Sequence, residues 1–186
     1  MATLFEWDEL NLIREEALRI MVLPPEVRQK EKKQFCDYLE YVLCVVYAYG
    51  WKDAEAIIGI VPFKDGLDDK CVNLEIANKT WRERADDIID SGTADEMLRL
   101  IDTESVRDYN TAVVDAGKES GNPNILKRWN TMEDEKVRGT HADIDMVTVG
   151  IDDKFYTYDG DSALAPGGFS LPENNINCRC WITLEL

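Results

Sequence analysis

The stretch Leu171-Pro-Glu-Asn-Asn-Ile-Asn-Cys-Arg-Cys180 decides the fold of the second half of this chain. Residues i and i+2 of an extended segment point to the same face, so Cys178 and Cys180 are expected side by side, with Arg179 opposite. The only histidine of the chain, His141, lies upstream of them. Two thiols and one imidazole can form a shared metal site, a redox pair or a small apolar contact in a core, and the spacing leaves all three open.

A structural zinc ion takes four nitrogen or sulfur ligands in a tetrahedron. His141, Cys178 and Cys180 supply three, and an acid such as Asp134 would supply the fourth. Further candidates for the fourth ligand are Asp143, Asp145 and the more distant Cys71. The alternative is that both cysteines pack as small hydrophobic side chains, because a CxC pair without a second pair is an incomplete metal-binding pattern.

Catalysis by the same residues has less support. A single histidine excludes mechanisms that need two imidazoles. A Cys–His dyad with His141 is formally available, but nothing local activates a thiol, and the surrounding acids are expected to raise its pKa. The segment Asp159-Gly-Asp161 is interpreted as a solvated turn and not as a cation site. We therefore predict that the chain is not an enzyme.

Composition narrows the class of protein. The 186 residues are 45% hydrophobic, which is typical of a globular protein. A formal net charge of −16 argues against nonspecific binding of nucleic acid or anionic membrane and favours a partner with a basic surface. The apolar run Leu39–Tyr49 is too short for a bilayer, which needs roughly 20 residues. No signal-peptide pattern opens the chain, so we expect a soluble intracellular protein whose five cysteines are not paired by default.

The first half is predicted to be helical. Apolar residues at three- and four-residue steps predict helices over residues 10–20, 35–49, 53–60, 74–88 and 97–117. Pro24-Pro25 separates the first two, Gly50 is expected to end the second, and residues 63–69 are interpreted as a connection. Thr93-Ala-Asp-Glu96 is a capping box that predicts the start of the last helix.

The character of the sequence changes after Gly121. Strands are predicted over residues 125–131, 147–149, 154–157 and 179–184, and a short helix over 134–141. The fold class is therefore α+β, with a helical N-terminal half followed by a small C-terminal α+β module with short strands. We expect a helical docking module over residues 1–75, long helices over 76–121, and a small Cys/His module over 122–186.

Several motifs of the second half occur in a recognisable order. They are Thr103-Glu104, Tyr109-Asn110, Lys127-Arg-Trp-Asn-Thr131, Val137-Arg138, Thr148-Val149, Asp152-Asp-Lys-Phe155 and Asn177-Cys-Arg-Cys180. This order resembles the phage head-morphogenesis family of minor capsid proteins, often called Mu F-like, from about Trp81 to Leu186. The positions that carry over are Trp129, Asp134, Arg138, His141, Phe155, Cys178 and Cys180.

The resemblance implies a low-copy structural component of a tailed-phage or prophage head. It would be associated with the portal vertex and act in head assembly or DNA delivery. Its partners would be the portal, the major capsid protein or a scaffolding protein, without sequence-specific nucleic acid binding and without a membrane. The location implied is the virion, and the host cytoplasm during assembly. The alternative is a small Cys/His or zinc-dependent enzyme or effector delivered into the host.

One position departs from the family pattern. Where members commonly show Asp-Gly after the histidine, this chain has Asp145-Met146. We expect a differently shaped loop there, because methionine does not take positive φ as readily as glycine does. Some members carry toxin or nuclease domains after this unit, and we expect none in this chain.

Overall fold

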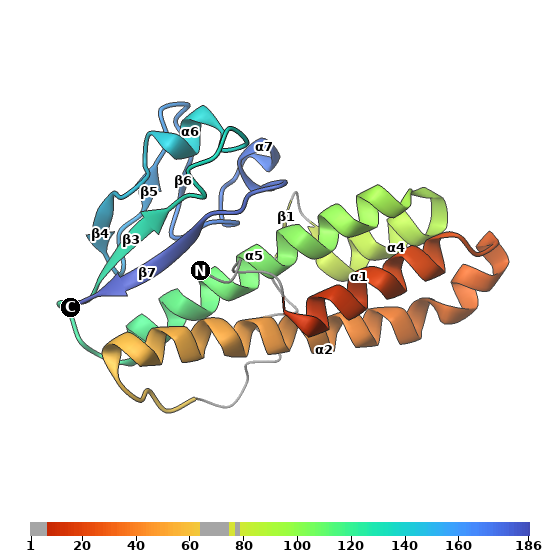
Figure 1. Ribbon diagram of the computed structural model, residues 1–186, viewed down its shortest axis with the longest axis horizontal. Coiled ribbons are helices and arrows are strands. Elements are labelled where there is room, and N and C mark those ends of the chain that lie inside the picture. The colour runs from red at the N-terminus through yellow and green to blue at the C-terminus, as the bar shows by residue number, and fades with distance from the viewer. Residues whose placement is uncertain (1–6, 64–74, 77–78) are drawn as a thin grey trace.

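A computed structural model describes residues 7–63, 75–76 and 79–186, and the structural statements below concern those residues. The candidate ligand Cys71 and most of the predicted connection over residues 63–69 lie outside them. The helices of the N-terminal part run roughly along the long axis of the molecule, and the C-terminal module covers one end of them (Figure 1). The fold is α+β, as the sequence predicts, with the helices first and short antiparallel strands after them.

No helix in the described ranges is long and apolar enough to span a bilayer.

The helix α2 (Pro25–Ile58) is the longest element and packs mainly against α5 (Ala94–Glu119). It is continuous through Gly50, so the prediction that Gly50 ends a helix is wrong. A Cβ at Gly50 would lie 2.3 Å from the backbone oxygen of Tyr109 on α5. The glycine is therefore needed for the close approach of two helices, and α2 ends instead at Gly59, whose φ is 87°.

The helix α1 (Asp8–Met21) precedes α2, and α4 (Trp81–Ser91) precedes α5. A capping box of Thr93 and Glu96 opens α5, as predicted, and an equivalent box of Thr80 and Glu83 opens α4. The predicted helix over residues 74–88 therefore starts too early. A two-stranded antiparallel hairpin, β1 (Glu75–Ile76) and β2 (Lys79–Thr80), stands at its expected first turn.

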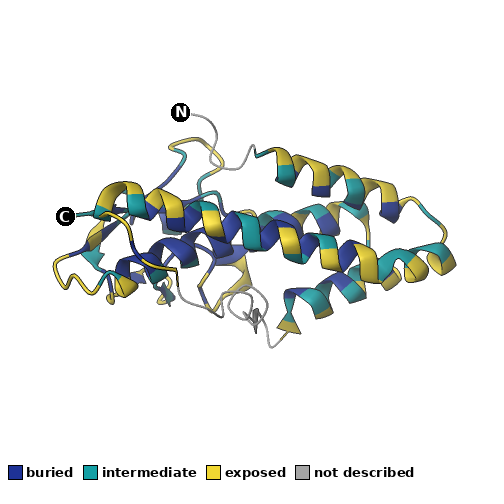
Figure 2. Ribbon diagram, turned by 90° about the horizontal axis from the view of Figure 1, so that it is seen from below, coloured by how far each residue is buried: buried dark blue, intermediate teal, exposed yellow. Residues whose placement is uncertain are grey.

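The helices share one apolar core. Their buried faces appear as dark blue bands between exposed yellow ones along each helix (Figure 2). Leu39 and Val46 of α2, Trp81 of α4 and Ile101 of α5 are each at most 1% exposed. Tyr41 is 59% exposed, so α2 is not apolar all round and has one solvent-facing side.

The C-terminal module is built on an antiparallel sheet in the order β4-β3-β7, from Thr148–Gly150, Leu126–Asn130 and Trp181–Glu185. A second pair, β5 (Phe155–Tyr156) and β6 (Ser162–Ala163), lies beside it, with the one-turn helices α6 (Gly139–Ala142) and α7 (Pro172–Asn175). The sequence missed β6 and α7, because elements of two to four residues carry no periodic signal.

Two details of this module differ from expectation. The predicted helix over residues 134–141 is helical only in α6, because the carboxylate of Asp134 accepts from the backbone amide of Lys136 and forms a turn instead. Met146 has φ 61°, so the loop keeps the left-handed backbone that a glycine would favour. Its side chain is 56% exposed and therefore has few close neighbours at this position.

A substitution of Gly50 tests the close packing of α2 on α5. Alanine in an unconstrained helix is favoured over glycine by about 1 kcal/mol, but here its methyl group would press on the α5 backbone. We expect Gly50→Ala to lower the free energy of unfolding by at least about 1 kcal/mol, measured by urea denaturation. The control Ala48→Gly, at an exposed position of the same helix, measures the helix-propensity difference alone. A stabilised Gly50→Ala variant would contradict the packing argument.

Candidate metal centre

The structure brings His141, Cys178 and Cys180 together. One ligand atom from each lies within 4.8 Å of the others, and all three residues are buried. The Nδ1 atom of His141 is 3.6 Å from Sγ of Cys178 and 3.4 Å from Sγ of Cys180. Both cysteines are free thiols. The three residues predicted from the sequence thus share one position in the fold, with Arg179 turned outward.

Local backbone geometry aims the three side chains. The turn before Cys178 passes through Asn177, whose φ of 57° is a left-handed conformation that asparagine tolerates well. The amide of Cys178 donates to the carbonyl of Asn175 at the end of α7. His141 sits on α6, where its amide donates to the carbonyl of Arg138. The asparagine of the Asn-Cys-Arg-Cys motif therefore has a backbone role.

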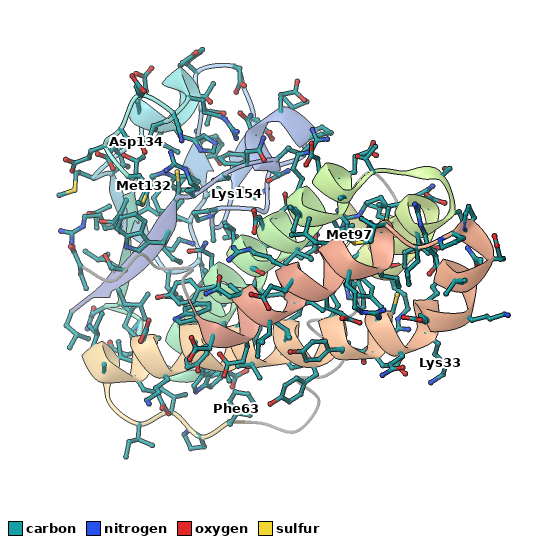
Figure 3. All side chains as sticks on the ribbon, turned by 45° about the vertical axis from the view of Figure 1, so that its right-hand side comes forward. Lys33, Phe63, Met97, Met132, Asp134 and Lys154 are labelled. Atoms are coloured by element: carbon teal, nitrogen blue, oxygen red, sulfur yellow. The ribbon has the colours of Figure 1, made fainter. Side chains whose placement is uncertain are left out.

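Asp134 does not join this cluster. Its carboxylate forms two hydrogen bonds with the Arg179 guanidinium, of 2.6 and 2.8 Å. This pair holds the pKa of Asp134 below its usual value, because the guanidinium favours the charged form. Figure 3 shows Asp134 on the outer edge of the module, near Met132. Asp134 thus fixes the outward residue of the motif in place, and the described residues offer a metal no fourth side-chain ligand.

Aromatic rings enclose the cluster. The His141 ring stacks on Phe169 with centroids 5.3 Å apart, and Trp129 meets it edge-on at 5.2 Å. Trp129 is fully buried and also contacts Phe155 edge-on. Low polarity around the sulfur and nitrogen atoms strengthens any charge–metal or charge–dipole interaction among them.

The two thiols differ in acidity. A hydrogen bond with Cys180 lowers the pKa of Cys178 well below its ordinary value, and His141 acts in the same direction against the effect of burial. The same hydrogen bond, together with burial, raises the pKa of Cys180. The expectation that nearby acids raise the thiol pKa is therefore wrong for Cys178. The pair favours one thiolate, which is the form that binds soft metals.

The donor set fits zinc. Zn–N and Zn–S bonds of about 2.05 and 2.3 Å in a tetrahedron place the nitrogen and sulfur ligands about 3.6 Å apart, close to the separations from His141. A pocket of about 10 Å³ next to the cluster is lined by Arg138, Lys136 and Met132, among others. This is about the space that one water molecule needs. A fourth ligand can therefore be a water or a donor from outside the described residues.

The loop between β6 and α7 is held by Asp161, a residue that the sequence places in a solvated turn. It is 5% exposed, so the interpretation as a solvated turn is wrong. Its carboxylate accepts from the amides of Ser162, Ser170 and Leu171 and from the Asn174 side chain. Burial opposes ionisation, but these hydrogen bonds outweigh it and lower the pKa of Asp161 to about 2.

Asn110 joins the module to the helices. It is fully buried on α5. Its side-chain amide donates to the carbonyls of Val106 and Cys180, and its side-chain oxygen accepts from the amide of Ile182, with distances of 2.7, 3.3 and 2.9 Å. One side chain thus fastens the start of β7, directly after the second cysteine, to the middle of α5.

Comparison with known proteins gives a family match over more than half of the chain. The family model described as phage Mu protein F like protein matches residues 73–183. The NAD(+)--arginine ADP-ribosyltransferase EFV of Enterococcus faecalis (strain ATCC 700802 / V583) is 34% identical over 94 residues, which are 49% of this chain and 19% of that protein. The chain thus spans about a fifth of the length of this curated relative. No solved structure matches.

Replacement of Asn110 tests the attachment of the module to α5. In Asn110→Ala the carbonyl of Cys180 and the amide of Ile182 lose a buried partner, at a cost of about 1–3 kcal/mol each. We expect chemical denaturation to show a loss of about 2–4 kcal/mol in the free energy of unfolding. The control Asn11→Ala, at an exposed site on α1, should change it by less than about 0.5 kcal/mol. Equal effects of the two changes would contradict the attachment.

Proposed function

Because this chain belongs to the family of phage Mu protein F like proteins, we propose that it is a structural protein of a tailed-phage or prophage head. The match over residues 73–183 carries this proposal, since it includes α4, α5 and the whole His141–Cys178–Cys180 cluster. The finer proposal is a low-copy minor capsid protein at the portal vertex that acts in head assembly or DNA delivery. Its partners would be the portal, the major capsid protein or a scaffolding protein.

We propose a separate role for each of the three segments into which the sequence divides the chain. Residues 1–75 dock on a partner, residues 76–121 link, and residues 122–186 form the Cys/His module. Leu12, Leu18 and Val22 support a docking role for the first segment, because they are 53%, 46% and 80% exposed on or next to α1. The segments share one apolar core, since α1 and α2 both pack on α5. The division therefore concerns roles and not separately folding units.

The Cys/His cluster would act as a staple in this proposal. The module has short strands and two one-turn helices, and small units of this kind need a stabilising element beyond their own core. A zinc ion held by His141, Cys178 and Cys180 would supply it by tying α6 to the start of β7. Asp134 serves the same region through Arg179 and not as a ligand.

We propose that the chain has no catalytic activity of its own. Family membership favours a structural role. The activity in the name of the Enterococcus relative belongs to a protein of which this chain covers 19%. The second candidate is an enzyme or effector delivered into the host, for which the small pocket beside His141 is the favouring observation. An open coordination position there would admit a reactive water.

Particle composition tests the head role. Quantitative mass spectrometry of purified virions and DNA-free procapsids, from the phage or prophage that encodes this chain, should find a few copies per particle in both. That result would establish a minor head component present from assembly onward. Absence from both kinds of particle would overturn the proposal and favour the effector.

Metal analysis tests the staple. We expect purified protein to carry one zinc ion per chain, and Cys178→Ser with Cys180→Ser to lose the zinc and melt several degrees lower. The control Asp134→Asn should keep its zinc, because it breaks only the pair with Arg179. A third variant, Cys71→Ser, shows by a loss of zinc whether that cysteine is the fourth ligand. Metal-free wild-type protein as stable as its double serine variant would disprove the staple.

A further inference from the structure

A cleft of about 360 Å³ lies between α5 and the loop that follows β6, away from the Cys/His cluster. Its walls include Val114, Leu164 and Pro166, and its charged residues are Arg107, Lys118, Lys154 and Asp115. The volume is within the range of small-molecule sites, roughly 300–1,000 Å³. Three cations against one acid make it a basic feature in a chain whose net charge is −16.

Arg107 is the residue that makes this cleft unusual. Its side chain is only 5% exposed, yet its one described ion pair is a long contact of 3.3 Å from Nη1 to Glu104. Glu104 is itself shared with Arg84, at 2.7 Å. The described residues give the other two nitrogens of the Arg107 guanidinium no acceptor. Burial lowers the pKa of Arg107, against the nearby acids Glu104 and Asp108, so the charge is incompletely compensated.

The cleft is built by a close backbone approach. Gly167 has φ 85°, and a Cβ there would lie 2.7 Å from Cβ of Arg107. Only glycine lets the loop after β6 lie directly on α5 at this point. The loop is also held by Ser170 and Leu171, whose amides donate to Asp161. The backbone and Cβ of Arg107 are therefore held directly against this loop at one end of the cleft.

Of the other charged residues of the cleft, two already have a partner in the protein and Lys154 has no ion pair within the described ranges. Asp115 accepts from the hydroxyl of Tyr47 at 2.7 Å, and Lys118 pairs with Asp152 at 3.1 Å. Lys154 is exposed and has no ion pair within the described ranges. A ligand in the cleft would therefore meet Arg107 inside and Lys154 at the rim.

We propose that this cleft binds a small organic anion, with its phosphate or carboxylate group on Arg107 and Lys154 and its apolar body against Val114 and Leu164. A guanidinium in a mostly apolar cleft recognises either group through paired hydrogen bonds. The apolar walls would make an organic anion bind more tightly than a bare inorganic one. This proposal is independent of the role in the phage head.

Nuclear magnetic resonance of the full ¹⁵N-labelled chain tests the cleft, with phenyl phosphate, 3-phenylpropionate and inorganic phosphate as probes. We expect saturable shifts of the Arg107 side-chain Nε–H and of the Gly167 and Gly168 amides. Phenyl phosphate should bind at least about fivefold more tightly than inorganic phosphate. Lys154→Gln should lower the affinity for phenyl phosphate by about threefold to tenfold. The control Lys30→Gln, at an exposed position on α2, should leave that affinity unchanged.

Arg107→Lys keeps the positive charge but loses the planar pair of guanidinium donors. It should therefore lower the affinity for both organic probes by at least about tenfold. If this buried substitution unfolds the protein, the comparison of Lys154→Gln with Lys30→Gln decides alone. Shifts that do not saturate would overturn the proposal, as would shifts spread evenly over the surface. Equal affinity of wild type and Lys154→Gln, or of inorganic and phenyl phosphate, would also overturn it.

Discussion

The contact on which the rest of the structure depends is the side chain of Asn110. Its fully buried side-chain amide donates to the carbonyl of Cys180, and its side-chain oxygen accepts from the amide of Ile182, on the two sides of Trp181. Because buried backbone groups must be paired, β7 has one register on α5. That register orders the β4-β3-β7 sheet, and it places Cys180 where His141 can meet it. The candidate metal centre therefore depends on helix–strand docking as well as on the local turn before Cys178.

Two different kinds of constraint shape the module and the helices. Glycines without a side chain permit two close backbone approaches to α5, by α2 at Gly50 against Tyr109 and by the loop after β6 at Gly167 against Arg107. The module is held by buried polar groups, with Asp161 collecting amides from a loop that has almost no regular structure. Apolar packing sets the distance between layers, whereas hydrogen bonds set the shape of the loops. A small unit with few strands buries little apolar surface and therefore depends far more on buried hydrogen bonds.

The sequence predicted those features that leave a periodic pattern or a fixed residue spacing. The helical first half, the Thr93 capping box and the facing pair Cys178 and Cys180 followed from residue spacing. Gly50 was misinterpreted because a glycine that ends a helix and one that permits helix contact look identical without the neighbouring α5. Asp161 and Lys127 were missed for a related reason. Lys127 is fully buried and donates to the Ile151 carbonyl, and burial lowers its pKa to about 8. Polarity alone does not predict such burial.

The strand order β4-β3-β7 also has a consequence for the order of events during synthesis. The helices α2 and α5 can pair once Glu119, the end of α5, has left the ribosome. β3 can then pair with β4, but its other edge stays unpaired until β7, much later in the chain, is available. The nascent protein thus passes through a period in which a finished helical layer carries an unfinished module. During that period Cys178 and Cys180 are not yet available to His141, because they directly precede β7 in the chain.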